Sequence, residues 1–417
     1  MVKVRKFKGY IPPKDKVAKV ISPPYDVLDT KEARVMAGDN PMCFLRCNKP
    51  ELEFPDSTDP YSQQIYERAR DNLQKFVKEG YLVKDNEDRM YVYSQKMGNH
   101  RQYAICALSS IEDYESNKIK KHELTRKDKE ADRTKITDIQ NANMGPVFLG
   151  YKHKATIDEI VSKVISNEPY ADVVTADGIQ HTLWFIDPKN SDILVQEFAT
   201  IPETYICDGH HRAASAYNVG KMRRDKAIAE GKKITGEEEF NYFLTLLYPD
   251  NNLKILDYNR VLKFLNNKSE SQILYELMEK YTITPVKDEP IPKKKGQHCL
   301  FIGGRWFRLD LDPKYINLKD PIGSLDVEIL KKEVIEPIFG ISDLRTDKRI
   351  DFVGGIRGYK ELEKRCVEDC KCAFAMYPVS IGEVMNIADS GLIMPPKSTW
   401  FEPKPRSGFV VRIFEGN

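Results

Sequence analysis

The spacing of apolar and polar residues predicts helices and strands that are mixed along the whole chain. Apolar side chains recur at helical spacing over residues 61–79, and Gly80 is a natural stop for that helix. Two segments of alternating polarity flank Gly98-Asn99, a turn sequence that predicts a hairpin. Strands are predicted at 17–21, 40–47, 90–95, 102–109, 242–248 and 373–379. The fold class that follows is α/β, or mixed α+β.

A short apolar run at 204–207 leads into a helix of small residues at 213–220. The junction between them holds Asp208, Gly209, His210, His211 and Arg212. Backbone amides at a helix start favour anions, arginine offers a bidentate fork, and a carboxylate can hold a cation or accept a proton. The same residues also fit a simple helix cap, with Asp208 capping and the histidines on a solvated turn. We interpret the cluster as functional, because dense polar clusters at strand ends tend to be sites.

Two charged segments frame this junction. Residues 118–138 carry His122 and Glu123 in a run with a thin apolar stripe. His122 and Glu123 fit a general base with its neighbour and fit a solvated face equally well, so both interpretations stay open. Residues 221–239 are predicted to be a charged, mobile insertion after the helix.

Composition excludes several classes of function. Lys and Arg total 65 against 63 Asp and Glu, so the global charge gives no argument for a nucleic-acid partner or an anionic membrane. No apolar run approaches the roughly 20 residues that span a bilayer, and the basic start is not followed by the apolar core of a secretory signal. We expect a cytoplasmic protein with no membrane partner and no nucleic-acid partner.

The eight cysteines are scattered, so we expect reduced thiols. Cys366, Cys370 and Cys372 are the exception to weigh, because such a cluster can bind metal or act in redox chemistry. No second Cys or His pair lies nearby at zinc-site spacing, and free cysteine is often a small buried hydrophobe. We therefore favour a structural role.

Several short motifs together resemble a large bacterial and archaeal family known as domain of unknown function 1015. They are Ser22-Pro23-Pro24-Tyr25-Asp26-Val27, His122-Glu123-Leu124-Thr125, Asp132-Arg133, Asn143 with Pro146-Val147-Phe148, Asp208-Gly209-His210-His211-Arg212 and Met394-Pro395-Pro396-Lys397-Ser398-Thr399. The resemblance covers nearly the whole chain and the combination is specific. It implies no activity, because the family's name concedes that none is generally established.

A more distant resemblance concerns function. A His-Glu segment, Asp208-Gly209-His210-His211-Arg212 and a closing Pro-Lys-Ser-Thr segment occur in the same order in the archaeal free serine kinases, whose fold belongs to the ParB/sulfiredoxin class. This chain is much longer, with an additional N-terminal region and the insertion at 221–239. The substrate pocket can therefore differ.

The resemblance implies a role for each matching residue. Glu123 would be the general base that accepts the proton of the substrate hydroxyl, and Asp208 would assist it or hold Mg²⁺. Nucleotide phosphates would face Gly209, His210, His211 and Arg212. The substrate or a phosphate would contact His122, Asn143, Lys397, Ser398 and Thr399.

The expected activity is that of a kinase that needs Mg²⁺ and a nucleotide, ATP or ADP, and acts on a small hydroxylated metabolite. Free L-serine is the best single candidate, and the oligomeric state stays open. The alternative is a non-catalytic, nucleotide-binding regulatory protein related to ParB-type proteins. A sulfiredoxin-like reaction is a third option, but Cys207 precedes the motif on a strand and is expected to be buried.

At 417 residues the chain is long enough for two or three domains. We expect an N-terminal α/β region at 1–115 and a ParB/sulfiredoxin-like core at 116–265 that carries the His-Glu and Asp-Gly-His-His-Arg motifs. A C-terminal α/β domain at 266–417 would follow, and its Pro-Pro-Lys-Ser-Thr tail would dock on the core.

Overall fold

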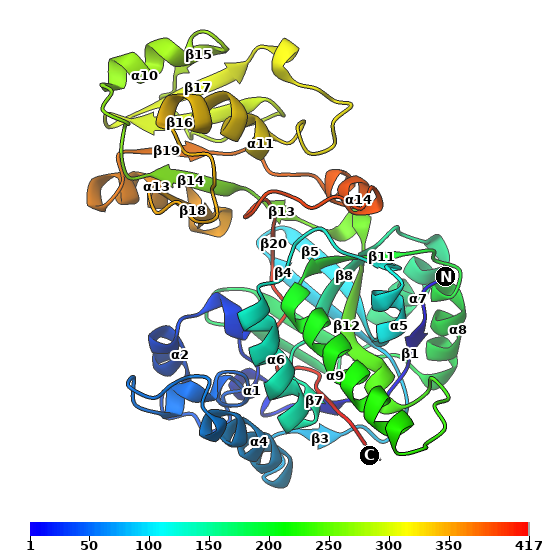
Figure 1. Cartoon of the computed structure of the whole chain (residues 1–417). Helices are drawn as coiled ribbons and strands as arrows, with labels where there is room; N and C mark the ends of the chain where they lie inside the picture. Colours follow the sequence, from blue (N-terminus) through cyan, green and yellow to red (C-terminus); the bar gives the residue numbers. More distant parts are fainter. Residues whose placement is uncertain (416–417) are drawn as a thin grey trace. The chain divides into compact units, whose positions relative to one another are not determined.

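The computed structural model describes residues 1–415 and divides the chain into two compact units. The first unit comprises Met1–Leu253 and the C-terminal residues from Pro403 onward, and the second comprises Lys254–Glu402 (Figure 1). This division differs from the three expected regions. Strands from both sides of the expected 115/116 boundary share one sheet, so that boundary lies inside a single folding core. The Pro-Pro-Lys-Ser-Thr tail belongs to the second unit, and the residues that follow it return to the first.

The first unit is built on a nine-stranded mixed sheet with the order β6-β11-β8-β12-β5-β4-β10-β9, in which β1 also pairs with β5. Its strands are β1 (Val4–Arg5), β4 (Tyr91–Met97), β5 (His100–Ser110), β6 (Ile119–Lys120), β8 (Val147–Tyr151), β9 (Ala171–Val174), β10 (Gln180–Phe185), β11 (Thr204–Asp208) and β12 (Tyr242–Pro249). Strands β4 and β5 pair antiparallel up to Met97 and His100, which confirms the hairpin predicted across Gly98-Asn99.

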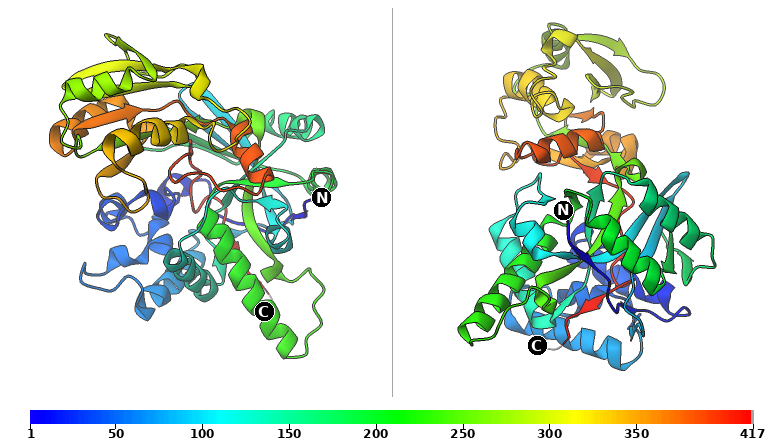
Figure 2. Two further views of the ribbon diagram at one scale, coloured as in Figure 1. Left: turned by 45° about the horizontal axis from the view of Figure 1, so that its top comes forward. Right: turned by 90° about the vertical axis from the view of Figure 1, so that its right-hand side faces the viewer.

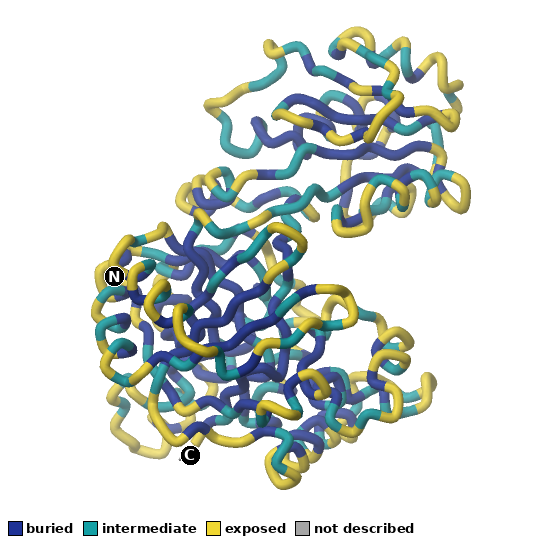
Figure 3. The backbone as a smooth tube through the Cα atoms, turned by 180° about the vertical axis from the view of Figure 1, so that it is seen from behind, coloured by how far each residue is buried: buried dark blue, intermediate teal, exposed yellow. Residues whose placement is uncertain are grey.

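The two faces of this sheet are covered differently. One face packs against helices α5 (Ile111–Glu115), α7 (Ala155–Ile165), α8 (Pro188–Phe198) and α9 (His210–Ala229). N-terminal and C-terminal segments cover the other face, where Phe7 contacts Tyr91 and Phe409 contacts Tyr93. Because both faces are covered, β12 is buried along its whole length. Figure 3 shows buried backbone through the middle of the first unit.

Helix α9 is longer than the sequence pattern suggested. It runs from His210 to Ala229 and projects beyond the sheet, so residues 221–229 continue the helix instead of forming a mobile insertion (Figure 2). Lysine, arginine, methionine and alanine all favour helix. Lys221, Asp225 and Lys226 of this last part are exposed, whereas Arg223 bonds to Asp138. Within the helix, Gly220 lets the backbone pack closely, since a Cβ there would lie 2.4 Å from the Phe240 carbonyl oxygen.

A helical layer packs beside α9 at one side of the first unit. Helices α4 (Gln63–Lys78) and α6 (Lys127–Gln140) contact each other, and α6 contacts α9. The N-terminal helices are α1 (Val17–Val20), α2 (Thr30–Ala37) and α3 (Leu45–Asn48). The strands predicted at 17–21 and 40–47 are therefore wrong. The short remaining strands are β2 (Tyr10–Ile11), β3 (Val83–Lys84), β7 (Ala142–Asn143) and β21 (Arg412–Ile413).

The second unit contains a six-stranded antiparallel sheet with the order β15-β17-β16-β19-β14-β18. Its strands are β14 (Tyr258–Leu262), β15 (Tyr281–Pro285), β16 (Gln297–Ile302), β17 (Arg305–Leu311), β18 (Ile350–Gly354) and β19 (Cys372–Ala375), and β13 (Ile255–Leu256) pairs with β20 (Trp400–Phe401). Its helices are α10 (Glu270–Leu277), α11 (Asp326–Leu330), α12 (Glu336–Phe339), α13 (Gly358–Glu368) and α14 (Ile381–Asp389). Both units thus have mixed α/β structure.

The cysteine cluster belongs to the core of the second unit. Cys370 is buried beside Cys299, and Cys366 packs against the same cluster. Among residues 1–415, no group of three or more His, Cys, Asp or Glu side chains is arranged to hold a metal ion. No helix in this same part of the chain is both long and apolar enough to cross a bilayer.

Candidate functional site

The site begins where strand β11 passes into helix α9. The strand ends at Asp208, with a register irregularity against β8, and the helix starts at His210. Gly209 between them has a left-handed conformation with φ of 90°. A Cβ at this position would also lie 3.0 Å from the Arg212 guanidinium carbon, so glycine satisfies both the turn and the folding back of the arginine. The predicted strand–helix junction is confirmed.

Asp208 is the centre of an ion-pair network and not a helix cap. Its Oδ2 accepts a hydrogen bond from Arg212 Nη2 at 2.5 Å, and its Oδ1 accepts one from Lys404 Nζ at 2.5 Å. Gly209 holds the cap position, where no side chain caps the helix. Burial by itself raises the pKa of Asp208, but Lys404 and Arg212 outweigh it and hold the pKa well below its usual range. Asp208 is therefore an ionised carboxylate and a weak proton acceptor.

Arg212 connects three of the sequence motifs. Besides Asp208, its guanidinium donates through Nη1 to the carbonyl of Pro146 and lies 3.9 Å from Asp26 Oδ2. Only 10 % of the side chain is exposed. Asp26 belongs to the Ser-Pro-Pro-Tyr-Asp-Val motif and Pro146 to the Asn143 motif, so side chains far apart in sequence meet at one guanidinium group.

The His-Glu segment packs on the start of helix α9. The rings of His122 and His210 are 4.7 Å apart and edge to face. Glu123 Oε2 lies 3.8 Å from His210 Nδ1, and the Glu123 side chain is 55 % exposed. On the same loop, the backbone N–H of Arg126 donates to His211 Nε2 at 3.1 Å. The structure thus brings Glu123 together with the Asp208–Arg212 cluster, across about 85 residues of chain.

The two buried histidines are neutral at pH 7. Burial lowers the pKa of His122 to about 4 and holds the pKa of His210 well below its ordinary value. Neither ring therefore supplies a positive charge for phosphate. Burial also lowers the pKa of the half-buried His211. Of His210, His211 and Arg212, which were expected to face phosphates, Arg212 alone carries a positive charge at pH 7. Their contact with phosphate stays a prediction. The ring of His210 packs against His122, on the segment that carries Glu123.

We expect this histidine pair to make the protein sensitive to acid. Because the folded pKa of His122 lies near 4 and the unfolded value near 6.5, the unfolded chain takes up the proton first as the pH falls. The contribution of neutral His122 to the free energy of unfolding is therefore complete above pH 6.5, and it is lost as the pH falls from 6.5 to 4. Urea unfolding across this range should show a shallower loss for His122→Gln than for the natural protein. Between pH 7 and 8 the free energies of unfolding of the two proteins should change with pH in parallel. Equal slopes of this free energy against pH below pH 6.5 would contradict the prediction.

The C-terminal segment completes the site. Pro403 accepts a hydrogen bond from Gln95 at 3.0 Å, and the Arg406 backbone donates to Tyr93 at 3.1 Å, so Lys404 is fixed between two anchors. The sequence pattern missed Lys404. The segment around it contains Trp400, Phe401, Pro403 and Pro405, and such a composition favours docking on a surface but does not tell which residue Lys404 meets.

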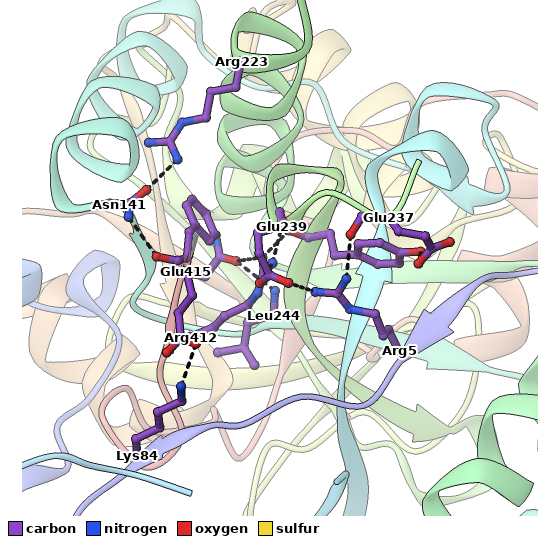
Figure 4. A network of polar contacts seen from close by, with 12 residues as sticks. Arg5, Lys84, Asn141, Arg223, Glu237, Glu239, Leu244, Arg412 and Glu415 are labelled. Carbon is purple, nitrogen blue, oxygen red and sulfur yellow. Dashed lines mark hydrogen bonds and ion pairs between the residues drawn. The ribbon is translucent and has the colours of Figure 1, made fainter. Parts of the chain in front are cut away.

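Two hydrogen bonds hold the side chain of Asn143 in place. Asn143 Oδ1 accepts hydrogen bonds from the Leu244 backbone and from Arg412 Nη1, both at 3.2 Å. Arg412 is 2 % exposed and also pairs with Glu239 at 2.8 Å (Figure 4). The last strand of the chain thereby positions a residue that was expected to contact substrate.

Lys397, Ser398 and Thr399 lie in the second unit. Lys397 has a positive φ of 57° and its Nζ lies 5.7 Å from the centre of the Tyr258 ring. Ser398 is buried, and its hydroxyl donates to the Pro395 carbonyl at 2.7 Å. Their contact with substrate or phosphate stays a prediction.

Comparison with known proteins decides the family. A family model described as a protein of unknown function, DUF1015, matches residues 4–328. The chain belongs to this family. No curated protein matches it significantly.

Several solved structures show a limited likeness to this chain. A free serine kinase variant in complex with AMP has 12% sequence identity and a TM-score of 0.35, with 74% of this chain and 92% of that chain covered. A conserved hypothetical protein from Pyrococcus furiosus has 14% identity and a TM-score of 0.32, with 74% and 95% covered. SbnI from Staphylococcus aureus, with a C-terminal truncation, has 10% identity and a TM-score of 0.37, with 72% and 85% covered. At such scores we draw nothing about activity from the likeness.

Proposed function

We propose that this DUF1015 protein is a nucleotide-dependent phosphotransferase that phosphorylates the hydroxyl group of a small metabolite at the start of helix α9. The observation that carries the proposal is the approach of an exposed carboxylate, Glu123, to a helix start that also holds Arg212, whose side chain is only 10 % exposed. The free N–H groups and the dipole of a 20-residue helix favour phosphate at this end. The motifs shared with the free serine kinases support the same assignment.

The residues fit the needs of phosphoryl transfer, which consist mostly of positioning and charge stabilisation. Glu123 accepts the proton of the acceptor hydroxyl as its oxygen attacks the terminal phosphorus of the nucleotide. The bond from that phosphorus to the leaving nucleotide oxygen breaks, and the charge on the transferred group faces Arg212 and the amides of Gly209, His210 and His211. Asp208 and Lys404 hold Arg212 in this orientation, so we assign Asp208 to positioning.

Mg²⁺ on Asp208 does not fit this arrangement, because each carboxylate oxygen of Asp208 already lies 2.5 Å from a cationic nitrogen. Whether ATP or ADP is the donor is part of the test below, and L-serine is the acceptor we propose first. We also propose that the first unit contains a ParB/sulfiredoxin-like core, and that His122, Asn143 and Lys397–Thr399 contribute to acceptor binding.

The test is phosphorus NMR of the full chain with L-serine and either ATP or ADP, with magnesium in the buffer. We expect a new phosphomonoester signal that requires protein, nucleotide and acceptor together. Nucleotide binding by calorimetry without any phosphoester or hydrolysis, over a panel of small hydroxy compounds, would contradict the proposal and favour a non-catalytic nucleotide-binding protein.

A further inference from the structure

A small cavity lies beside Arg212 within the first unit. Its volume is about 50 Å³. Its polar lining includes Tyr25, Asn48, Arg133, Asn143, Arg212 and Ser407. Tyr25 and Arg133 come from motifs to which the proposed phosphotransfer assigns no role, and Asn48 comes from the end of helix α3. The cavity therefore joins unassigned residues to one wall of the proposed phosphate site.

Two buried donors of this cavity are without partners. Asn48 is 5 % exposed, and its Nδ2 has no hydrogen-bond partner within residues 1–415. Arg212, whose side chain is 10 % exposed, also lines the cavity, and its Nε has no partner among the described residues. A buried N–H group without an acceptor costs free energy, so such donors on residues that line a cavity point to an acceptor that binds there.

The charge of the wall specifies the sign of that acceptor. Arg133 and Arg212 place two guanidinium groups on the cavity. Arg133 pairs with Asp132 at 2.6 Å and stacks over Tyr25 at 4.2 Å. Asp132 pairs with Arg133, and Asp208 and Asp26 lie beside Arg212. None of these three is among the lining residues, and no carboxylate lines the described cavity. The wall consequently favours an anion.

The size of the cavity excludes a nucleoside. One water needs roughly 10–15 Å³ by the same measure, so about 50 Å³ admits a group of a few heavy atoms. A planar carboxylate has this size and matches the fork of a guanidinium group and the amide of an asparagine.

Resting on the proposed phosphotransfer, we propose that this cavity binds the carboxylate of the acceptor, between Asn48, Arg133 and Arg212. The acceptor is then a compact hydroxy acid or hydroxylated amino acid, and an alcohol without a carboxylate is a poor substrate. Asn48 and Arg133 become specificity residues of the site.

The test is calorimetry on the full chain without nucleotide, with L-serine, D-glycerate and glycolate as probes. Ethanolamine and ethylene glycol are the matched compounds that lack the carboxylate. We expect at least one of the three acids to bind, and both alcohols to bind at least 10-fold more weakly. Asn48→Asp keeps the size of the side chain, replaces the donor with a negative charge and should weaken binding of that acid at least 10-fold. ADP affinity should not change.

Controls separate local effects from unfolding. Asn251→Asp makes the same change at an exposed position and should leave every affinity unchanged. If Asn48→Asp does not fold by circular dichroism, Arg133→Gln takes its place with the same expectation. Absence of binding by all three acids, or acid binding that neither variant weakens, overturns the inference. Weakened binding of ADP or sodium phosphate instead of the acids also overturns it, because the cavity would then serve the nucleotide.

The inference and the proposed function fail differently. If one of the three acids binds in a way that depends on Asn48 but the protein transfers no phosphoryl group, the proposed function is wrong and the carboxylate assignment of the cavity is retained. If L-serine and ethanolamine are phosphorylated equally well, the carboxylate assignment of the cavity is wrong and the proposed function is retained.

Discussion

Replacing Arg212 with alanine should lower the rate of phosphoryl transfer by about 10²–10³-fold, the usual cost of removing one preorganised donor from a developing charge. The substitution also leaves Asp208, whose side chain is 19 % exposed, paired with Lys404 alone. We therefore expect a second effect, a decrease of about 3–5 kcal/mol in the free energy of unfolding, which is typical when a buried pair loses a partner. Steady-state turnover and urea unfolding measure the two effects separately.

Two further variants separate the role of Arg212 from general effects of losing an arginine. Arg212→Lys keeps the charge but loses the planar fork that reaches both Asp208 and Pro146, so we expect partial recovery of stability and little recovery of rate. Arg70→Ala removes an arginine of helix α4 that pairs with the neighbouring Asp71, and should change neither quantity. An Arg212→Ala protein that folds and turns over at the natural rate would exclude Arg212 from the chemistry.

The second large effect is expected at Glu123. Glu123→Gln removes the proton acceptor and keeps the shape of the side chain, so kcat should fall by about 10²–10⁴-fold. The side chain is 55 % exposed, and its neighbour His210 is neutral, so the melting temperature should change little. Rapid-quench kinetics at saturating nucleotide and acceptor measure the loss.

Glu159→Gln, an exposed glutamate on helix α7, provides the matched control and should keep the natural rate. A Glu123→Gln protein with unchanged kcat would remove the general base from the mechanism. A protein that loses its melting transition as well would assign Glu123 to folding.

The sequence pattern predicts the parts of this molecule that depend on near neighbours. The hairpin across Gly98-Asn99 and the junction around Gly209 follow from turn chemistry and apolar periodicity within a few residues. Strand β12 follows from the mostly apolar segment at 242–248, whose side chains need cover on both faces of the sheet. These predictions are confirmed because local and tertiary preferences agree.

The errors arise where distant contacts decide the structure. Residues 17–20 form a helix although their valines favour strand, because both Val17 and Val20 are fully buried by tertiary packing. Residues 221–229 continue helix α9. The sequence pattern does not predict this, because a charged segment fits a loop and the solvated part of a helix equally well.

The candidate site divides in the same way. The cluster of Asp208, His210 and Arg212 is visible as a local motif, but the partner of Asp208 is not. Lys404 lies 196 residues away, and no periodicity connects the two positions. The pKa values of His122 and His210 are equally hidden, because burial sets them and burial depends on how the charged segment at 118–138 packs.

The most direct measurement is a crystal structure of the full chain with ADP or ATP. We expect nucleotide phosphates within hydrogen-bond distance of the Arg212 guanidinium and of the first N–H groups of helix α9, with the Glu123 carboxylate facing the terminal phosphorus. A nucleotide bound elsewhere on the chain, with the start of helix α9 unchanged, would contradict this expectation.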